Sequence, residues 1–121
     1  FLAGLFSCAK EEGEGGTSTI KGKIFVRNYN ANFTVLEDAY YAPEVDVYIV
    51  YGNDYVYADR FETHYDGTYR FQHLRKGNYT IYAYSKDSTG ASPSGVIPIE
   101  KEVKITSNHQ EIEVPDIVIL K

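Results

Sequence analysis

Apolar and polar residues alternate with a period of two through most of this chain, and the alternation is clearest between residues 63 and 85. There Tyr69 and Phe71 alternate with polar neighbours, and a second run of the same kind follows residues 76–78. This period is typical of a strand with one buried face and one wet face. Asp66-Gly67 precedes the first run and is a hairpin signal, because tight primed turns need residues that tolerate positive φ. We therefore expect two strands, each preceded by a turn.

The same pattern predicts further strands on both sides of this stretch. Their expected inward positions are Ile20, Gly22, Ile24 and Val26; Val45, Val47, Ile49 and Tyr51; Tyr57 and Phe61; Ile97, Ile99, Val103 and Ile105; and Ile112, Val114, Ile117 and Ile119. Residues 28–42 are expected to form a loop that crosses from one sheet to the other. The last run changes phase at Pro115-Asp116, where we expect a bulge, because proline in sheets is found at edges and bulges. No window has a helical period, so the pattern predicts an all-β, antiparallel Greek-key β-sandwich of about seven strands.

A set of residues in and around the central stretch resembles a known family. The set is Thr63, Asp66, Gly67, Tyr69, Phe71, Leu74, Gly77, Tyr79 and Ile81. It resembles the pattern of carboxypeptidase regulatory-like domains and, more broadly, of transthyretin-like (prealbumin-like) sandwiches, with a weaker match from about Thr19 to Leu120. The resemblance implies a prealbumin-like sandwich and says little about function, since such sandwiches host many roles.

Composition narrows the class of protein. The chain has 121 residues, which is the length of one domain, and 43% of them are hydrophobic while 24% are charged, as in globular proteins. The net charge of −5 argues against a nucleic-acid partner, which would call for a basic surface. A single cysteine excludes an internal disulfide.

That cysteine, Cys8, closes an apolar segment, and Leu5-Phe6-Ser7-Cys8 resembles a bacterial lipobox. The resemblance implies that residues 1–8 are the end of a lipoprotein signal peptide and that Cys8 carries lipid, which is enough to anchor a protein to a membrane. The alternative is a short apolar strand with a buried thiol. Residues 9–18 have the composition of a flexible acidic tether, which places the sandwich at residues 19–121.

Cys8 followed by Lys10-Glu11-Glu12 also resembles an export signal found in Bacteroidetes lipoproteins. This implies a lipid-anchored location on the Gram-negative outer membrane, with the cell surface favoured over the periplasmic face.

Catalytic and metal sites are not indicated. His64, His73 and His109 lack the spacing of metal ligands, and the Asp residues do not follow a calcium-loop pattern. No serine sits in a Gly-x-Ser-x-Gly elbow. The chain also lacks the Tyr-Arg-Gly-Ser ending of the transthyretin-like enzymes that hydrolyse a purine breakdown product. We therefore expect no enzyme activity, no cofactor and no metal site.

Tyrosine is the most distinctive residue type, with 12 copies. Tyr48, Tyr82 and Tyr84 are out of phase with the inward residues, and Tyr55 follows a Gly-Asn-Asp turn, so these four are candidate ligand-binding residues. Exposed tyrosine rings offer apolar faces with a polar rim, which suits stacking on sugars or docking of a protein. The alternative is that tyrosine simply fits a half-wet sheet face and pairs across strands.

Three functions are compatible with these features. The first is a lipid-anchored, non-catalytic cell-envelope binding or adhesion module for a glycan or a protein partner. The second is a structural accessory subunit of a larger outer-membrane assembly for polysaccharide uptake or of pilus-like type. The third is a hydrolase of transthyretin-like type, which the missing tail motif disfavours.

Overall fold

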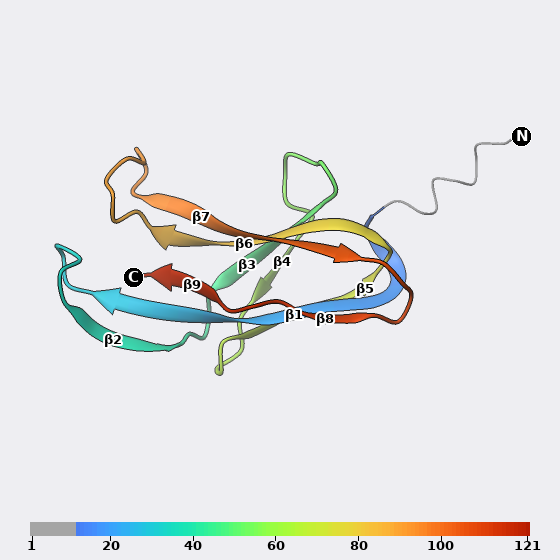
Figure 1. The fold of residues 1–121 in the computed structure, drawn as a ribbon, viewed down its shortest axis with the longest axis horizontal. Helices are drawn as coiled ribbons and strands as arrows, with labels where there is room; N and C mark the ends of the chain where they lie inside the picture. Colours follow the sequence, from blue (N-terminus) through green and yellow to red (C-terminus); the bar gives the residue numbers. More distant parts are fainter. Residues whose placement is uncertain (1–11) are drawn as a thin grey trace, which may run out of the picture.

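The computed structural model describes residues 12–121, and all regular elements within that range are strands. They are β1 (Glu14–Tyr29), β2 (Leu36–Tyr41), β3 (Asp46–Tyr51), β4 (Asp59–Glu62), β5 (Thr68–Leu74), β6 (Gly77–Lys86), β7 (Val96–Ile105), β8 (Glu111–Glu113) and β9 (Ile117–Leu120). The predicted all-β class is confirmed (Figure 1). In this range there is no helix that is long and apolar enough to cross a membrane.

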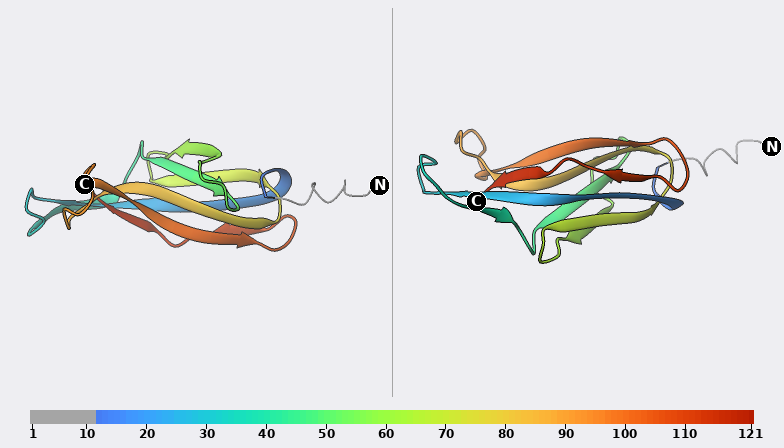
Figure 2. Two further views of the ribbon diagram at one scale, coloured as in Figure 1. Left: turned by 90° about the horizontal axis from the view of Figure 1, so that it is seen from above. Right: turned by 60° about the horizontal axis from the view of Figure 1, so that its bottom comes forward.

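The strands form two sheets that pack face to face (Figure 2). One sheet is antiparallel, with the strand order β4-β3-β6-β7. The other is built on β1, whose first half pairs with β5 and β8 and whose second half pairs with β2 and β9. The Val114 and Lys121 N–H groups donate to the carbonyls of Lys21 and Arg27, so β8 and β9 lie along one edge of β1. Ile24 bonds in the other direction, to Gly67 and Ala42, so β5 and β2 lie along the other edge. The result is a sandwich with β1 running its full length.

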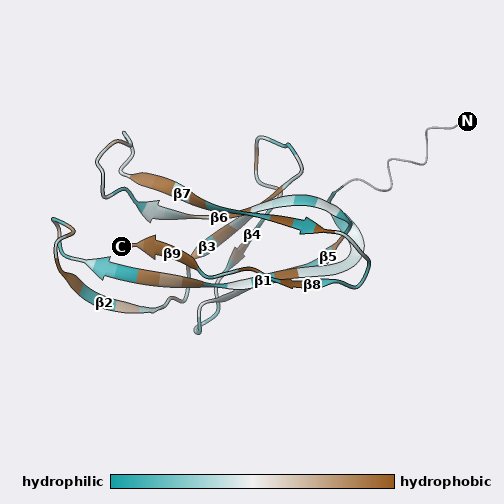
Figure 3. Cartoon of the chain, viewed as in Figure 1, coloured by the Kyte–Doolittle hydropathy of each residue, from teal (hydrophilic) through white to brown (hydrophobic). Residues whose placement is uncertain are grey.

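The core lies between the two sheets, at most of the positions that the alternation predicts. Ile24, Ile49 and Ile81 are completely buried, and the rings of Tyr69 and Tyr79 also lie inside. Figure 3 shows in brown the hydrophobic residues within β3, β7 and β9. Burial of these side chains is the main favourable term in folding, at about 25 cal/mol for each Å² of apolar surface removed from water.

The last strands pair with β1 in parallel, which differs from the antiparallel expectation. Thr19 pairs with Glu111, and Ile24 pairs with Ile117. The chain takes four steps from Glu113 to Ile117 while β1 takes only three from Lys21 to Ile24, so one residue is extra. The bulge predicted at Pro115-Asp116 is therefore confirmed, and it keeps both Val114 and Ile117 in the core.

The turn at Asp66-Gly67 does not form a hairpin, and that prediction was wrong. β4 pairs with β3 and β5 pairs with β1, so the turn links the two sheets. The local chemistry is as expected, since Gly67 has a φ of 83° and the Asp66 carboxylate accepts hydrogen bonds from the Thr68 backbone N–H and hydroxyl. The Thr63 hydroxyl donates to the carbonyl of Ala42, which ties the start of the turn to the segment between β2 and β3.

Residues 28–42 also differ from the expectation of a crossing loop. They form the end of β1, a short loop and β2, which pairs antiparallel with β1 in the same sheet. The Asn30 side-chain oxygen accepts hydrogen bonds from the N–H groups of Thr34 and Val35, and these bonds shape the loop. The chain passes to the other sheet only after β2, ahead of β3.

The folded part begins earlier than expected. β1 starts at Glu14, and Ser18 is buried, so residues 14–18 of the expected tether belong to the sandwich. Backbone contacts explain this, because the Arg75 N–H donates to the carbonyl of Gly13 and the Gly13 N–H donates to the Tyr79 hydroxyl. Residues 1–11, which include Cys8 and the lipobox-like segment, lie outside the described residues.

Candidate functional site

Four tyrosine rings gather on the outer face of the β4-β3-β6-β7 sheet. Tyr48 of β3 stacks on Tyr82 of β6, with ring centroids 5.0 Å apart and planes 20° apart. Tyr84 lies edge-on to both rings, at 5.9 Å from Tyr48 and 5.6 Å from Tyr82. Tyr57 packs against Tyr48 at 4.7 Å. We call Tyr48, Tyr57, Tyr82 and Tyr84 the tyrosine cluster.

An open groove of about 370 Å³ runs beside the cluster. Its walls include Tyr82 and Tyr84 from β6 and Tyr55 from the β3–β4 loop. Tyr55 is fully exposed and Tyr84 is 48% exposed, so their rings are available to a ligand. The structure thus brings three of the four predicted residues into ring contact and places Tyr55 with two of them around one groove.

Tyr57 was assigned to the wrong face. The alternation predicts that residues 55–62 form one strand with Tyr57 in the core. In the structure β4 begins only at Asp59, and Tyr57 is 46% exposed against Tyr48. Phe61 lies within β4 and packs against the core, as predicted.

The groove is acidic. Asp54 and Glu100 line it, and neither a lysine nor an arginine does. Arg60, on the same face of the sheet, is paired with Asp46 at 2.9 Å across β3 and β4. Two carboxylates and aromatic rings therefore face the same space, which gives a ligand both hydrogen-bond acceptors and apolar contact.

The rings of the cluster also shield one another from water. Burial, and secondarily Tyr84, raises the pKa of Tyr82 to about 12. Burial likewise raises the pKa of Tyr48 above its ordinary value. Both phenols therefore keep their protons at physiological pH and present neutral hydroxyl groups.

The histidines do not converge. His64 lies just before β5, His73 lies near the end of β5 with a φ of 61°, and His109 lies in the turn before β8. Within residues 12–121, no three His, Cys, Asp or Glu side chains gather in a way that would hold a metal ion.

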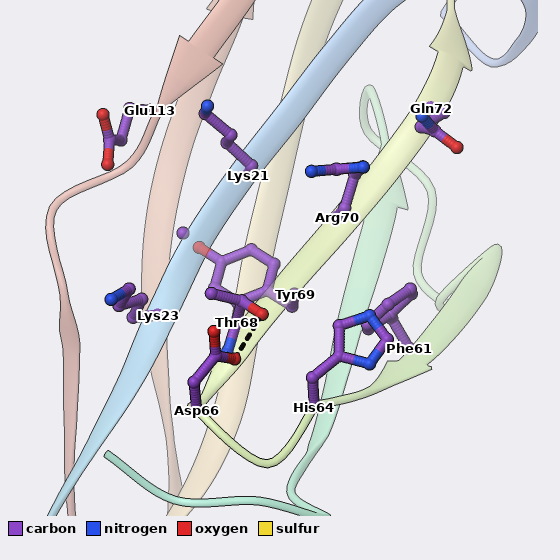
Figure 4. Close-up of a pocket in the computed structure, with 11 residues that line it drawn as sticks. Lys21, Lys23, Phe61, His64, Asp66, Thr68, Tyr69, Arg70, Gln72 and Glu113 are labelled. Atoms are coloured by element: carbon purple, nitrogen blue, oxygen red, sulfur yellow. Dashed lines mark hydrogen bonds between the residues drawn. The ribbon is translucent and has the colours of Figure 1, made fainter.

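A second depression, of about 480 Å³, lies on the outer face of the other sheet. It carries Lys21 and Lys23 from β1 and Arg70 from β5, with His64 and Asp66 at one end (Figure 4). We call it the basic depression. The alternation of the sequence indicates that all three cations point outward, but it does not indicate that β1 pairs with β5. The depression was therefore not predicted from the sequence.

Comparison with known proteins gives the fold only. No family model matches the chain, and no curated protein matches it in sequence. The structure is similar to that of a Pseudomonas aeruginosa protein that is provisionally described as a carbohydrate binding protein, with a TM-score of 0.55 and 15% identity over 94% of each chain. A second similar structure is (S)-allantoin synthase, with a TM-score of 0.42 and 13% identity over 84% of this chain and 42% of that one.

Proposed function

We propose that this domain is a non-catalytic glycan-binding module that holds saccharide at the groove beside the tyrosine cluster. The observation that carries the proposal is the joint placement of exposed tyrosine rings and two carboxylates around one open groove. The rings offer apolar faces for the C–H face of a pyranose, and the carboxylates accept hydrogen bonds from sugar hydroxyls.

Two further points support a dedicated site over an ordinary sheet surface. Cross-strand pairing accounts for Tyr48 and Tyr82, which are directly opposite in the register of β3 and β6. It does not account for Tyr55, whose ring is fully exposed on a loop. The similar Pseudomonas structure, with its provisional description as carbohydrate binding, also favours a glycan over a protein partner.

Substitution of tyrosines at the groove tests the proposal. Wild-type protein is screened on an array of neutral and acidic oligosaccharides, and a hit is measured by calorimetry. Tyr84→Ser and Tyr82→Ser/Tyr84→Ser are expected to lose about tenfold or more in affinity, because each removes a stacking surface. The matched control is Tyr65→Ser, since Tyr65 is 88% exposed but lies outside the groove. Equal binding by wild type and the double variant, or no saccharide bound at all, would refute a glycan site here.

We also propose that Cys8 carries lipid and that the domain is held at the outer membrane, facing the cell surface. The lipobox-like segment supports this, and the lipid supplies the membrane affinity, at about 0.8 kcal/mol for each buried methylene. Only a few residues then separate the anchor from Gly13, which is bound to the sandwich through Arg75 and Tyr79.

Metabolic labelling with a tagged fatty acid tests the anchor. The full-length protein is expected to incorporate the label and to fractionate with outer membranes, while Cys8→Ser is expected to do neither. Protease added to intact cells should degrade the wild-type protein if it faces outward. Label retained by the Cys8→Ser variant would contradict the assignment of the anchor.

A further inference from the structure

We propose that the basic depression is a binding site for a single oxyanion, either a sulfate or phosphate group or the carboxylate of an acidic sugar, with Arg70 as its main contact. The site lies on the opposite sheet from the tyrosine cluster and is independent of the function proposed there.

The register of β1 and β5 places like charges opposite each other. Lys21 lies directly opposite Arg70, and Lys23 lies directly opposite Thr68. Like charges directly opposite each other on one face of an antiparallel pair are destabilising. Glu111, bound to Lys21 at 3.2 Å, offsets part of this repulsion, and an anion bound at Arg70 would offset the remainder.

The three cations of the depression differ in the partners that they have. Lys21 is bound to Glu111 at 3.2 Å, and the ammonium of Lys23 lies 5.0 Å from the centroid of the Tyr41 ring. Neither of the two ion pairs within residues 12–121 involves Arg70. Its guanidinium is exposed at the depression and lacks a carboxylate partner in the described part of the chain.

The lining of the depression has more basic than acidic side chains. Asp66 and Glu113 line it against Lys21, Lys23 and Arg70, so its lining is positive on a chain with a net charge of −5. The Asp66 carboxylate is already bound to the Thr68 hydroxyl at 2.6 Å and to the Thr68 N–H, and these bonds hold its pKa below the ordinary value.

The shape of the donors decides the class of ligand. Figure 4 shows the guanidinium of Arg70 beside Lys21, with His64 and Thr68 at the lower end of the same depression. A guanidinium presents two parallel N–H donors that match two oxygens of a carboxylate, sulfate or phosphate, and a nearby ammonium adds a second charge. The groove at the tyrosine cluster has the opposite charge, so the two outer faces select different ligands.

Titration with small anions at low ionic strength tests the site. Sodium sulfate, sodium phosphate and a uronic-acid trisaccharide are added separately, and backbone amide shifts are followed by NMR. Saturable shifts are expected at Lys21, Thr68 and Arg70 and should be absent from the tyrosine cluster. A larger response to the trisaccharide than to the inorganic ions identifies a sugar carboxylate as the ligand, and the reverse identifies sulfate or phosphate.

Two substitutions make the test decisive. Arg70→Gln is expected to weaken binding about tenfold or more, since it removes the charge-assisted hydrogen bonds of the guanidinium. Arg27→Gln is the matched control, because Arg27 is an exposed arginine of β1 that does not line the depression. Equal losses in both variants would show non-specific charge attraction, and unchanged binding by Arg70→Gln, or shifts spread over the whole surface, would overturn the proposal. Thermal unfolding of each variant checks that the fold is retained.

Discussion

Replacement of Ile81 by alanine is expected to lower the free energy of unfolding by about 2–5 kcal/mol, because it leaves a cavity in a fully packed position. Ile81 is completely buried in β6, and β6 lies between β3 and β7 in the middle of its sheet. Its register partner on β3 is Ile49, which is also completely buried. Urea unfolding followed by circular dichroism measures the change.

Thr80→Ala is the matched control for this substitution. Thr80 is the preceding residue of β6 and is half-buried on the outer face, so its loss should change stability by no more than about 0.5 kcal/mol. A small effect of Ile81→Ala together with a large effect of Thr80→Ala would mean that β6 presents its other face to the core.

Gly22→Ala is expected to destabilise the sandwich by about 1–3 kcal/mol through overpacking. Gly22 is a buried position of β1, and a Cβ atom there would lie 2.5 Å from the hydroxyl oxygen and 2.8 Å from Cζ of Tyr69. The Tyr69 ring is itself buried beneath β1 and has little room to move. Thermal and urea unfolding of the variant give the size of the loss.

The Tyr69 hydroxyl offers a way to verify this cause. It is buried without a hydrogen-bond partner in the described structure, so Tyr69→Phe alone should leave stability unchanged or raise it. Tyr79→Phe is the matched control and should cost about 1 kcal/mol, because the Tyr79 hydroxyl donates to the Arg75 carbonyl at 2.6 Å and accepts from the Gly13 N–H. Gly22→Ala combined with Tyr69→Phe should recover part of the loss, and strict additivity of the two changes would argue against contact between them.

The alternation of the sequence was enough to predict most of the residues that fill the core, with Tyr57 and Ile97 as exceptions. Ile20, Val47, Tyr79 and Ile81 are buried as expected, because a strand sends successive side chains to opposite faces whatever its neighbours are. The bulge at Pro115 was also predictable, since the phase change in the sequence is the bulge itself. Both results follow from local chain geometry.

Pairing of strands was not predictable in the same way. Asp66-Gly67 has the chemistry of a hairpin turn, yet the strands beside it join different sheets. The turn chemistry fixes the backbone only over a few residues, whereas the choice of partner depends on which edges are free in the assembled fold. The parallel pairing of β1 with β8 and β9 is a further case, because nothing in either segment marks its direction relative to the other.

For the candidate sites too, the sequence shows the face that a residue occupies but not its partner on the next strand. Tyr48, Tyr82 and Tyr84 were found because their phase shows which face they occupy, while Tyr57 was misplaced because its segment is not a strand. The basic depression depends on Lys21 lying opposite Arg70, and this is a property of register. A sequence shows which face of its own strand a side chain occupies. It does not show which side chain of the neighbouring strand lies beside it.

The long separation in sequence between β1 and its partners β8 and β9 affects how the sandwich reaches its native state. Six strands, β2 to β7, separate β1 in the sequence from β8 and β9, the strands that complete one of its edges. This edge of β1 therefore stays open until β8 and β9 dock on it, and closing so long a loop slows folding. An unpaired strand edge is a site for aggregation, so holdase chaperones that cover it should raise the yield of native protein.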